Sequence, residues 1–207
     1  MSKSGKTGGP LTFDMDVWEG LSYGQHPEQA IDAWELNDLA PRAGWPAVLL
    51  FSDGPAPESS KDPFRVFGPL LARRGVLVAT ASVRWTAEWS DLHNDALSAI
   101  DRLLGLQINP KRVALWGVGD GGYLALAAAE SLEASAVRAV VTVGCPETMK
   151  ACAAPALTGE LASGEFHLKL PANPGLRQQQ RAQRWLINAI ADHQRGSKWK
   201  FRKKKNR

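Results

Sequence analysis

Polar and apolar residues alternate in two short segments near the start of the chain. Residues 16–23 and 29–36 alternate with a period of two, which is typical of half-buried strands. A turn-like Gly-Gln-His-Pro sequence at 24–27 separates them and predicts an antiparallel hairpin. Further along, continuous apolar runs rich in Val and Leu favour strands that are covered on both faces. These runs lie at residues 47–51, 76–81, 113–116 and 137–143, and a last strand is expected at 165–170.

Helical patterns separate the apolar runs. Residues 64–74 and 90–104 place their apolar positions on one stripe, with Ser90 as the expected N-cap of the second helix. Two more helices are expected at 123–132 and 178–193. Strands that alternate with helices form βαβ units. We therefore predict an α/β fold with a mostly parallel sheet, helices on both faces and the hairpin at one edge.

A glycine-rich turn follows the expected strand that ends near residue 116. It reads Gly-Val-Gly-Asp-Gly-Gly over residues 117–122 and leads into a helix rich in Ala. A strand, a sharp turn of small residues and a helix form the nucleophile elbow of α/β-hydrolases. Side chains beside so sharp a turn would strike the strand or the helix, and the residue at its apex is strained. The pattern therefore indicates such an elbow.

This turn and several upstream segments resemble the esterase and feruloyl-esterase-like branch of the α/β-hydrolases. Residues 23–34 resemble its opening hairpin, and residues 47–62 lie where that branch has its His-Gly-Gly oxyanion strand and loop. Residues 71–84 look like its next helix and strand. The resemblance implies a reduced α/β-hydrolase fold without a cap domain, which we assign to residues 11–194.

The sequence departs from the family where the chemistry would take place. The apex serine of the family aligns with Gly119, which has no side chain to attack a carbonyl group. In the oxyanion loop, Pro55 offers no backbone N–H, and Asp53 brings a negative charge toward the developing oxyanion. The degenerate elbow comprises Gly117, Gly119, Asp120, Gly121 and Gly122, and the degenerate oxyanion loop comprises Ser52, Asp53, Gly54 and Pro55.

The catalytic acid and base are also missing from their expected places. Only the residues 144–163 separate the last two expected strands, and this segment is too short for a helix, an acid-bearing strand and another helix. A Pro-Ala-Asn-Pro-Gly sequence at 171–175 stands where the histidine loop should be. Asp120 lies one residue past the apex, so a role as a carboxylate at a helix N-terminus is favoured over one as nucleophile. We therefore expect no catalytic residue.

The remaining histidines and cysteines are expected to be structural. None of the histidines follows a strand at the catalytic place; they are His26, His93, His167 and His193. Cys145 follows a strand, where a buried and inert thiol is expected. With Cys152 it forms neither a disulfide framework nor a zinc site, which suits a reducing compartment. No metal and no cofactor are expected.

Eight tryptophans are many for 207 residues. Three of them, Trp34, Trp116 and Trp185, fall on expected core positions. The others cannot all be buried in so small a domain, so we expect some of them to form a binding surface. They are Trp18, Trp45, Trp85, Trp89 and Trp199.

The charge of the chain is concentrated at its C-terminal end. The whole chain has 25 bases and 21 acids, and eight of the bases but none of the acids lie in residues 195–207. Residues 1–194 therefore carry 17 bases and 21 acids, a net charge of −4. We expect residues 195–207 to form an extended basic tail that binds a partner. Its binding residues are Lys198, Trp199, Lys200, Phe201, Arg202, Lys203, Lys204 and Lys205.

Three kinds of partner fit the tail. Nucleic acid would take the charges on phosphates and stack the aromatic rings, an anionic membrane surface would hold the bases, and an acidic protein groove would bury Trp199. A solvated terminus without a partner is the alternative. The acidic body favours a protein assembly.

The polar residues 1–10 are expected to be flexible and lack the apolar core of a signal peptide, and no apolar run is long enough to span a membrane. A cytoplasmic location follows, at most peripheral to a complex or a membrane surface.

The function predicted from these features is that of a catalytically inactive α/β-hydrolase homologue. It would act as a structural or binding subunit of a larger protein assembly and dock partly through its tail. Two alternatives stay open: an active carboxylesterase-type hydrolase with relocated catalytic groups, and a small-molecule binding module that uses the vestigial pocket.

Overall fold

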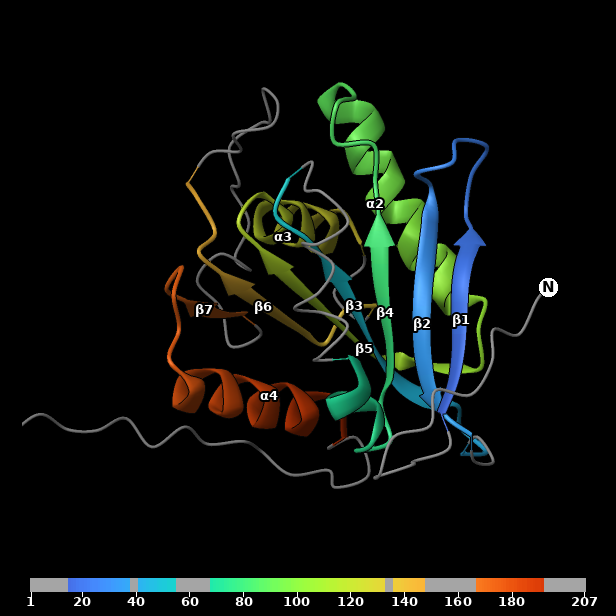
Figure 1. Ribbon diagram of the computed structural model, residues 1–207, viewed down its shortest axis with the longest axis vertical. Helices are drawn as coiled ribbons and strands as arrows, with labels where there is room; N and C mark the ends of the chain where they lie inside the picture. The colour runs from blue at the N-terminus through green and yellow to red at the C-terminus, as the bar shows by residue number, and fades with distance from the viewer. Residues whose placement is uncertain (1–14, 38–40, 55–67, 133–135, 148–166, 192–207) are drawn as a thin grey trace, which may run out of the picture.

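The central feature of the computed structural model is one seven-stranded sheet, built from the described residues 15–37, 41–54, 68–132, 136–147 and 167–191 (Figure 1). The strand order is β1-β2-β4-β3-β5-β6-β7. Strand β2 is antiparallel to both of its neighbours, β1 and β4, and the other neighbouring strands are parallel. The strands are β1 Met15–Ser22, β2 Ala30–Leu36, β3 Trp45–Phe51, β4 Leu77–Ser82, β5 Ile108–Val118, β6 Ala139–Val143 and β7 His167–Leu170.

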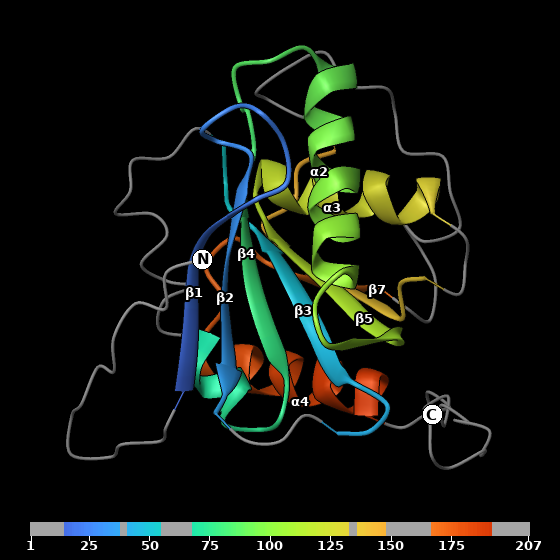
Figure 2. The same ribbon diagram turned by 90° about the vertical axis from the view of Figure 1, so that its right-hand side faces the viewer.

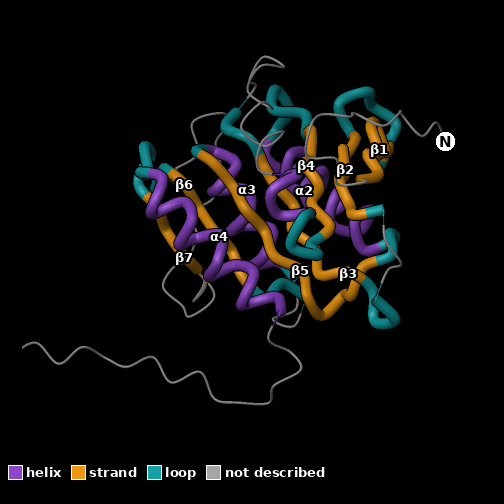
Figure 3. The backbone as a smooth tube through the Cα atoms, turned by 60° about the horizontal axis from the view of Figure 1, so that its bottom comes forward, coloured by secondary structure: helices purple, strands orange, loops and turns teal. Residues whose placement is uncertain are grey.

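The helices cover both faces of this sheet (Figure 2). Helices α2 (Trp89–Leu104) and α3 (Asp120–Ser131) pack on one face, and α4 (Leu176–Ala191) lies on the other, across β5 and β6 (Figure 3). Successive side chains of a strand point to opposite faces. The predicted α/β fold, with a mostly parallel sheet between helices, is therefore confirmed.

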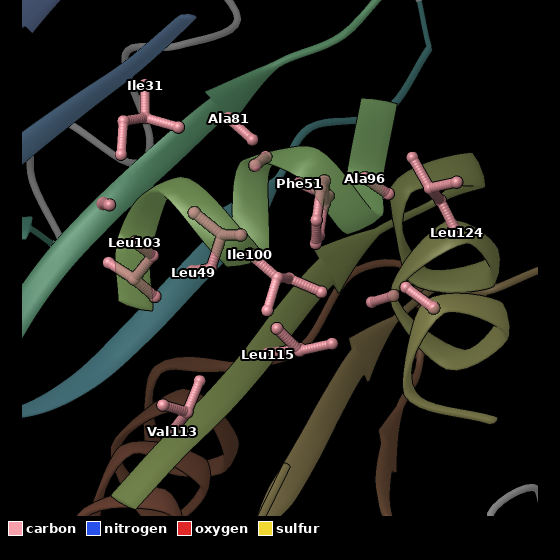
Figure 4. Close-up of a cluster of buried hydrophobic side chains, with 14 of the residues drawn as sticks. Ile31, Leu49, Phe51, Ala81, Ala96, Ile100, Leu103, Val113, Leu115 and Leu124 are labelled. Carbon is pink, nitrogen blue, oxygen red and sulfur yellow. The ribbon is translucent and has the colours of Figure 1, made fainter. Parts of the chain in front are cut away.

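Strand β3 shows how the two cores form. Its Leu49 faces α2, and Figure 4 shows it close to Ile100 of that helix and to Leu115 of β5. Its neighbour Leu50 belongs to the other core, together with Leu186 of α4. All seven residues of β3 are buried, as the continuous apolar run predicts.

The helix boundaries differ from the prediction at three places. Helix α2 begins at Trp89 and its N-cap is Glu88, not Ser90, so the predicted cap is wrong. Ser90 instead lies in the first turn, and the cap makes no side-chain hydrogen bond. Helices α3 and α4 begin three and two residues earlier than expected, because the glycines and polar residues at their starts hide the helical period. Of the helix expected at 64–74, residues 68–72 are described and helical.

Four of the five tryptophans among which a binding surface is expected lie in the described residues. Trp45 and Trp85 are buried, each with 8% of its surface exposed. Trp18 and Trp89 are partly buried and pack against the core beneath α2 and α3. The expectation is therefore wrong for the buried Trp45 and Trp85, and it stays a prediction for Trp18 and Trp89. Trp199 lies outside the described residues.

A buried carboxylate ties the hairpin to α2. The Asp95 carboxylate, with 2% of its side chain exposed, forms an ion pair of 2.7 Å with Arg84 and also accepts a hydrogen bond of 2.7 Å from Gln29 Nε2. Burial alone would raise the pKa of Asp95, but the hydrogen bonds from Arg84 and Gln29 outweigh it and lower that pKa. Gln29 belongs to the turn between β1 and β2, so this network fixes the turn against the helix.

Several predictions concern residues that the structure does not describe. Both the flexible start at 1–10 and the basic tail at 195–207 lie outside the described residues, as does Pro55. Within the described part of the chain, no helix combines the length and the apolar character needed to cross a membrane.

Candidate functional site

The site lies at the turn between β5 and α3, at the carboxyl end of a central strand of the sheet. Gly119 at the apex has φ 53° and ψ −125°. Its N–H donates a hydrogen bond of 2.8 Å to the carbonyl of Val143, and its carbonyl accepts one of 3.0 Å from Gly122. A side chain would be strained at this positive φ, which is tolerated in functional turns only where the surrounding structure enforces it. The turn is therefore as sharp as the glycine pattern predicts.

Two flanking glycines are required by close backbone contacts. A Cβ atom on Gly117 would lie 2.5 Å from the Cα of Gly122, within the first turn of α3. A Cβ atom on Gly121 would lie 2.5 Å from the carbonyl oxygen of Phe51, at the end of β3. Real Cβ atoms do not approach other atoms so closely. These glycines allow β3, β5 and α3 to meet at one point.

The carboxylate of Asp53 occupies the space beside the apex. A Cβ atom on Gly119 would collide with this carboxylate and lie 2.5 Å from its Oδ2 atom. Asp53 follows β3, which pairs with β5 in parallel, so the topology brings this loop to the turn. The backbone N–H of Asp120 donates a hydrogen bond of 2.9 Å to Asp53 Oδ1. Asp53 thus fills the place of the side chain that Gly119 lacks.

This arrangement has a direct chemical consequence. In α/β-hydrolases the N–H of the residue after the nucleophile helps to form the oxyanion hole. Here that residue is Asp120, and its N–H is already bound to a carboxylate. The negative charge of Asp53 would oppose the charge that develops on a carbonyl oxygen during acyl transfer. The contact joins the loop after β3 to the start of α3, and it occupies the N–H that an oxyanion would need.

Asp120 itself lies in the first turn of α3, with 5% of its surface exposed. A carboxylate at this position interacts favourably with the helix dipole. Its position agrees with the expected structural role at a helix N-terminus.

The described histidines have partners of their own. His26 Nδ1 lies 3.3 Å from the backbone N–H of Glu28 in the hairpin turn. His93 stacks on Trp89, with a ring-centroid distance of 5.3 Å. His167 lies within β7, and its Nε2 is 2.8 Å from Thr142 Oγ1.

These contacts show how each described imidazole is held, in a turn, on a helix and in a strand. His193 lies outside the described residues. Of the described histidines only His26 lies in a loop after a strand, and that loop is the hairpin turn between β1 and β2.

Cys145 is a half-buried thiol beside the elbow. Its Sγ donates a hydrogen bond of 3.4 Å to the carbonyl of Pro146. Burial raises its pKa, Asp120 raises it further, and Lys169 opposes the shift. The thiol therefore stays protonated at neutral pH and is a poor nucleophile. Cys152 lies outside the described residues.

The structure says less about a metal site and about the predicted partner-binding residues. Within the described ranges, no group of three His, Cys, Asp or Glu side chains could hold a metal ion. The predicted partner-binding residues 198–205 lie beyond the last described residue. The sequence predicted that Asp53 brings a negative charge to the oxyanion loop. It did not predict that the carboxylate fills the space beside Gly119. The sequence feature that could have indicated this contact is the combination of a glycine at the apex and an aspartate in the loop after the neighbouring strand.

Comparisons with known proteins give structural matches only. No family model and no curated protein matches the sequence. Esterase B from Lactobacillus rhamnosis is similar in structure, with a TM-score of 0.55 and 16% sequence identity over 89% of this chain and 60% of the esterase. A truncated carbohydrate esterase from gut microbiota has a TM-score of 0.52 and 18% identity over 67% of this chain and 61% of that chain.

An acetyl xylan esterase from Paenibacillus sp. R4 has a TM-score of 0.51 and 15% identity, over 69% of this chain and 52% of that chain. The chain thus spans less than two thirds of each of these three esterases. At this level of identity the likeness concerns the fold alone. The chain has the α/β-hydrolase fold that these esterases share.

Proposed function

We propose that this protein is a catalytically inactive α/β-hydrolase homologue that serves as a structural or binding subunit of a larger protein assembly. The observation that carries the proposal is the contact between Asp53 and the backbone N–H of Asp120, beside an apex without a side chain. An ester substrate would find neither a nucleophile nor a free oxyanion donor at this point.

The other parts of a hydrolytic site support the same proposal. The described histidines are held by Glu28, Trp89 and Thr142. The loop after β7, where the family has its catalytic histidine, reads Pro-Ala-Asn-Pro-Gly and contains no histidine. Acyl transfer by this fold needs a nucleophile, a base and an acid that orients the base. A stable scaffold remains, with two buried cores and surfaces that are free to bind a partner.

Hydrolysis of a short-chain p-nitrophenyl ester tests the catalytic part of the proposal. We expect the wild-type protein to show the same slow rate as the variants Asp53→Asn and Asp120→Ala. Thermal melts of all three proteins should accompany the assay, so that a loss of folding is not taken for a loss of activity. Turnover by the wild type that either substitution abolishes would contradict the proposal and favour a hydrolase with relocated groups.

The proposed role as a subunit of a larger assembly needs a separate measurement. In a gradient of a native extract at low salt, we expect the chain to sediment with a complex much larger than a monomer. Sedimentation as a monomer at every salt concentration would contradict it. Thermal stabilisation by a small ester or carboxylate, without any complex, would instead indicate the small-molecule binding module.

A further inference from the structure

We draw no further inference here: the strongest candidate, the side-chain pair between α2 and α3 in which Ser131 Oγ lies 3.1 Å from His93 Nε2, carries none, because the Ser131 hydroxyl already donates a hydrogen bond to the carbonyl of Ala127 and no second observation among the described residues points to a ligand or a substrate there.

Discussion

Gly119 and Asp53 occupy one small volume at the end of β5. The positive φ of Gly119 disfavours any other residue, and the carboxylate of Asp53 fills the space in which a side chain would begin. Two independent effects therefore oppose a substitution at the apex. They can be separated, because only the second disappears when Asp53 is removed.

We predict that Gly119→Ala lowers the free energy of unfolding by about 2 kcal/mol or more, since a strained backbone alone costs about 1–3 kcal/mol. In the double variant Asp53→Gly/Gly119→Ala, the loss should be smaller than the sum of the single losses by about 1 kcal/mol. Urea unfolding measures both. Gly105→Ala is the matched control, because Gly105 ends α2 with φ −74° and should tolerate alanine within about 0.5 kcal/mol. Additive losses would show that Asp53 does not occupy the apex in solution.

Asp95 is a buried carboxylate whose charge is expected to contribute to stability. We predict that Asp95→Asn lowers the free energy of unfolding at pH 7 by about 3 kcal/mol, because Arg84 loses its buried partner. The control Asp91→Asn affects an exposed pair of 4.0 Å with the same arginine and should cost less than about 0.5 kcal/mol. Equal effects of the two substitutions would contradict the role of the buried network.

The pH dependence of stability follows from the lowered pKa of Asp95. An aspartate in an unfolded chain titrates near pH 3.9, and in the folded protein Asp95 titrates lower. Its contribution is therefore complete above about pH 5 and is lost as the pH falls through 3.9 to the folded pKa. The difference in stability between wild type and Asp95→Asn should shrink below about pH 4. A difference that stays constant down to pH 2.5 would contradict the shift.

Among the elements, α4 alone of the labelled helices covers the second face of the sheet. Its Leu186 is fully buried with Leu50 and Trp116, whereas Leu176 in the first turn is 69% exposed. We predict that Leu186→Ala costs about 2–5 kcal/mol of stability, as a buried large-to-small change does. Leu176→Ala should cost less than about 0.5 kcal/mol. Thermal or urea unfolding tests this pair, and similar effects of the two would mean that α4 does not pack on the sheet as described.

The sequence predicted the elements whose period is unmistakable. The continuous apolar runs became β3, β4, β5 and β6, and the two alternating segments became the hairpin of β1 and β2. Element ends were harder to predict, because capping depends on backbone geometry more than on residue type. Glu88 caps α2 although Ser90 is the better N-cap residue by propensity.

The sequence could predict the site only at the positions where steric crowding requires glycine. Gly117 and Gly121 are glycines because the backbone leaves no room, and a sequence pattern can show that. The position of Asp53 depends on β3 and β5 being neighbours, a contact between residues 67 positions apart along the chain. Local sequence patterns do not show which residues so far apart along the chain come into contact. The burial of Trp45 and Trp85 was missed for the same reason, since it results from packing between distant elements.

At the scale of the whole molecule, charge is arranged by face and by segment. Helix α2 is acidic and α4 is basic, and the eight bases of the last 13 residues follow α4 in the chain. The face of α4 is therefore more positive than the face of α2.

We predict that deleting residues 196–207 reduces the salt concentration at which the protein elutes from a heparin column. The midpoint of thermal unfolding should stay the same, because the two cores consist of residues before this segment. The variant Arg177→Gln/Arg181→Gln/Arg184→Gln should lower the elution point further in the truncated chain. Unchanged elution after the deletion would show that the tail is a passive terminus.

The Asp53 carboxylate fills the space that a side chain at position 119 would need. This contact restricts how the chain could acquire a nucleophile at that position by mutation. A serine at position 119 would meet the carboxylate of Asp53, so this change alone is expected to damage the turn. Replacement of Asp53 alone removes the carboxylate that accepts the N–H of Asp120 and preserves the glycine. The order of the two steps is therefore constrained: position 53 must change before position 119. A serine at position 119 is in this sense opposed by a residue of the loop after β3.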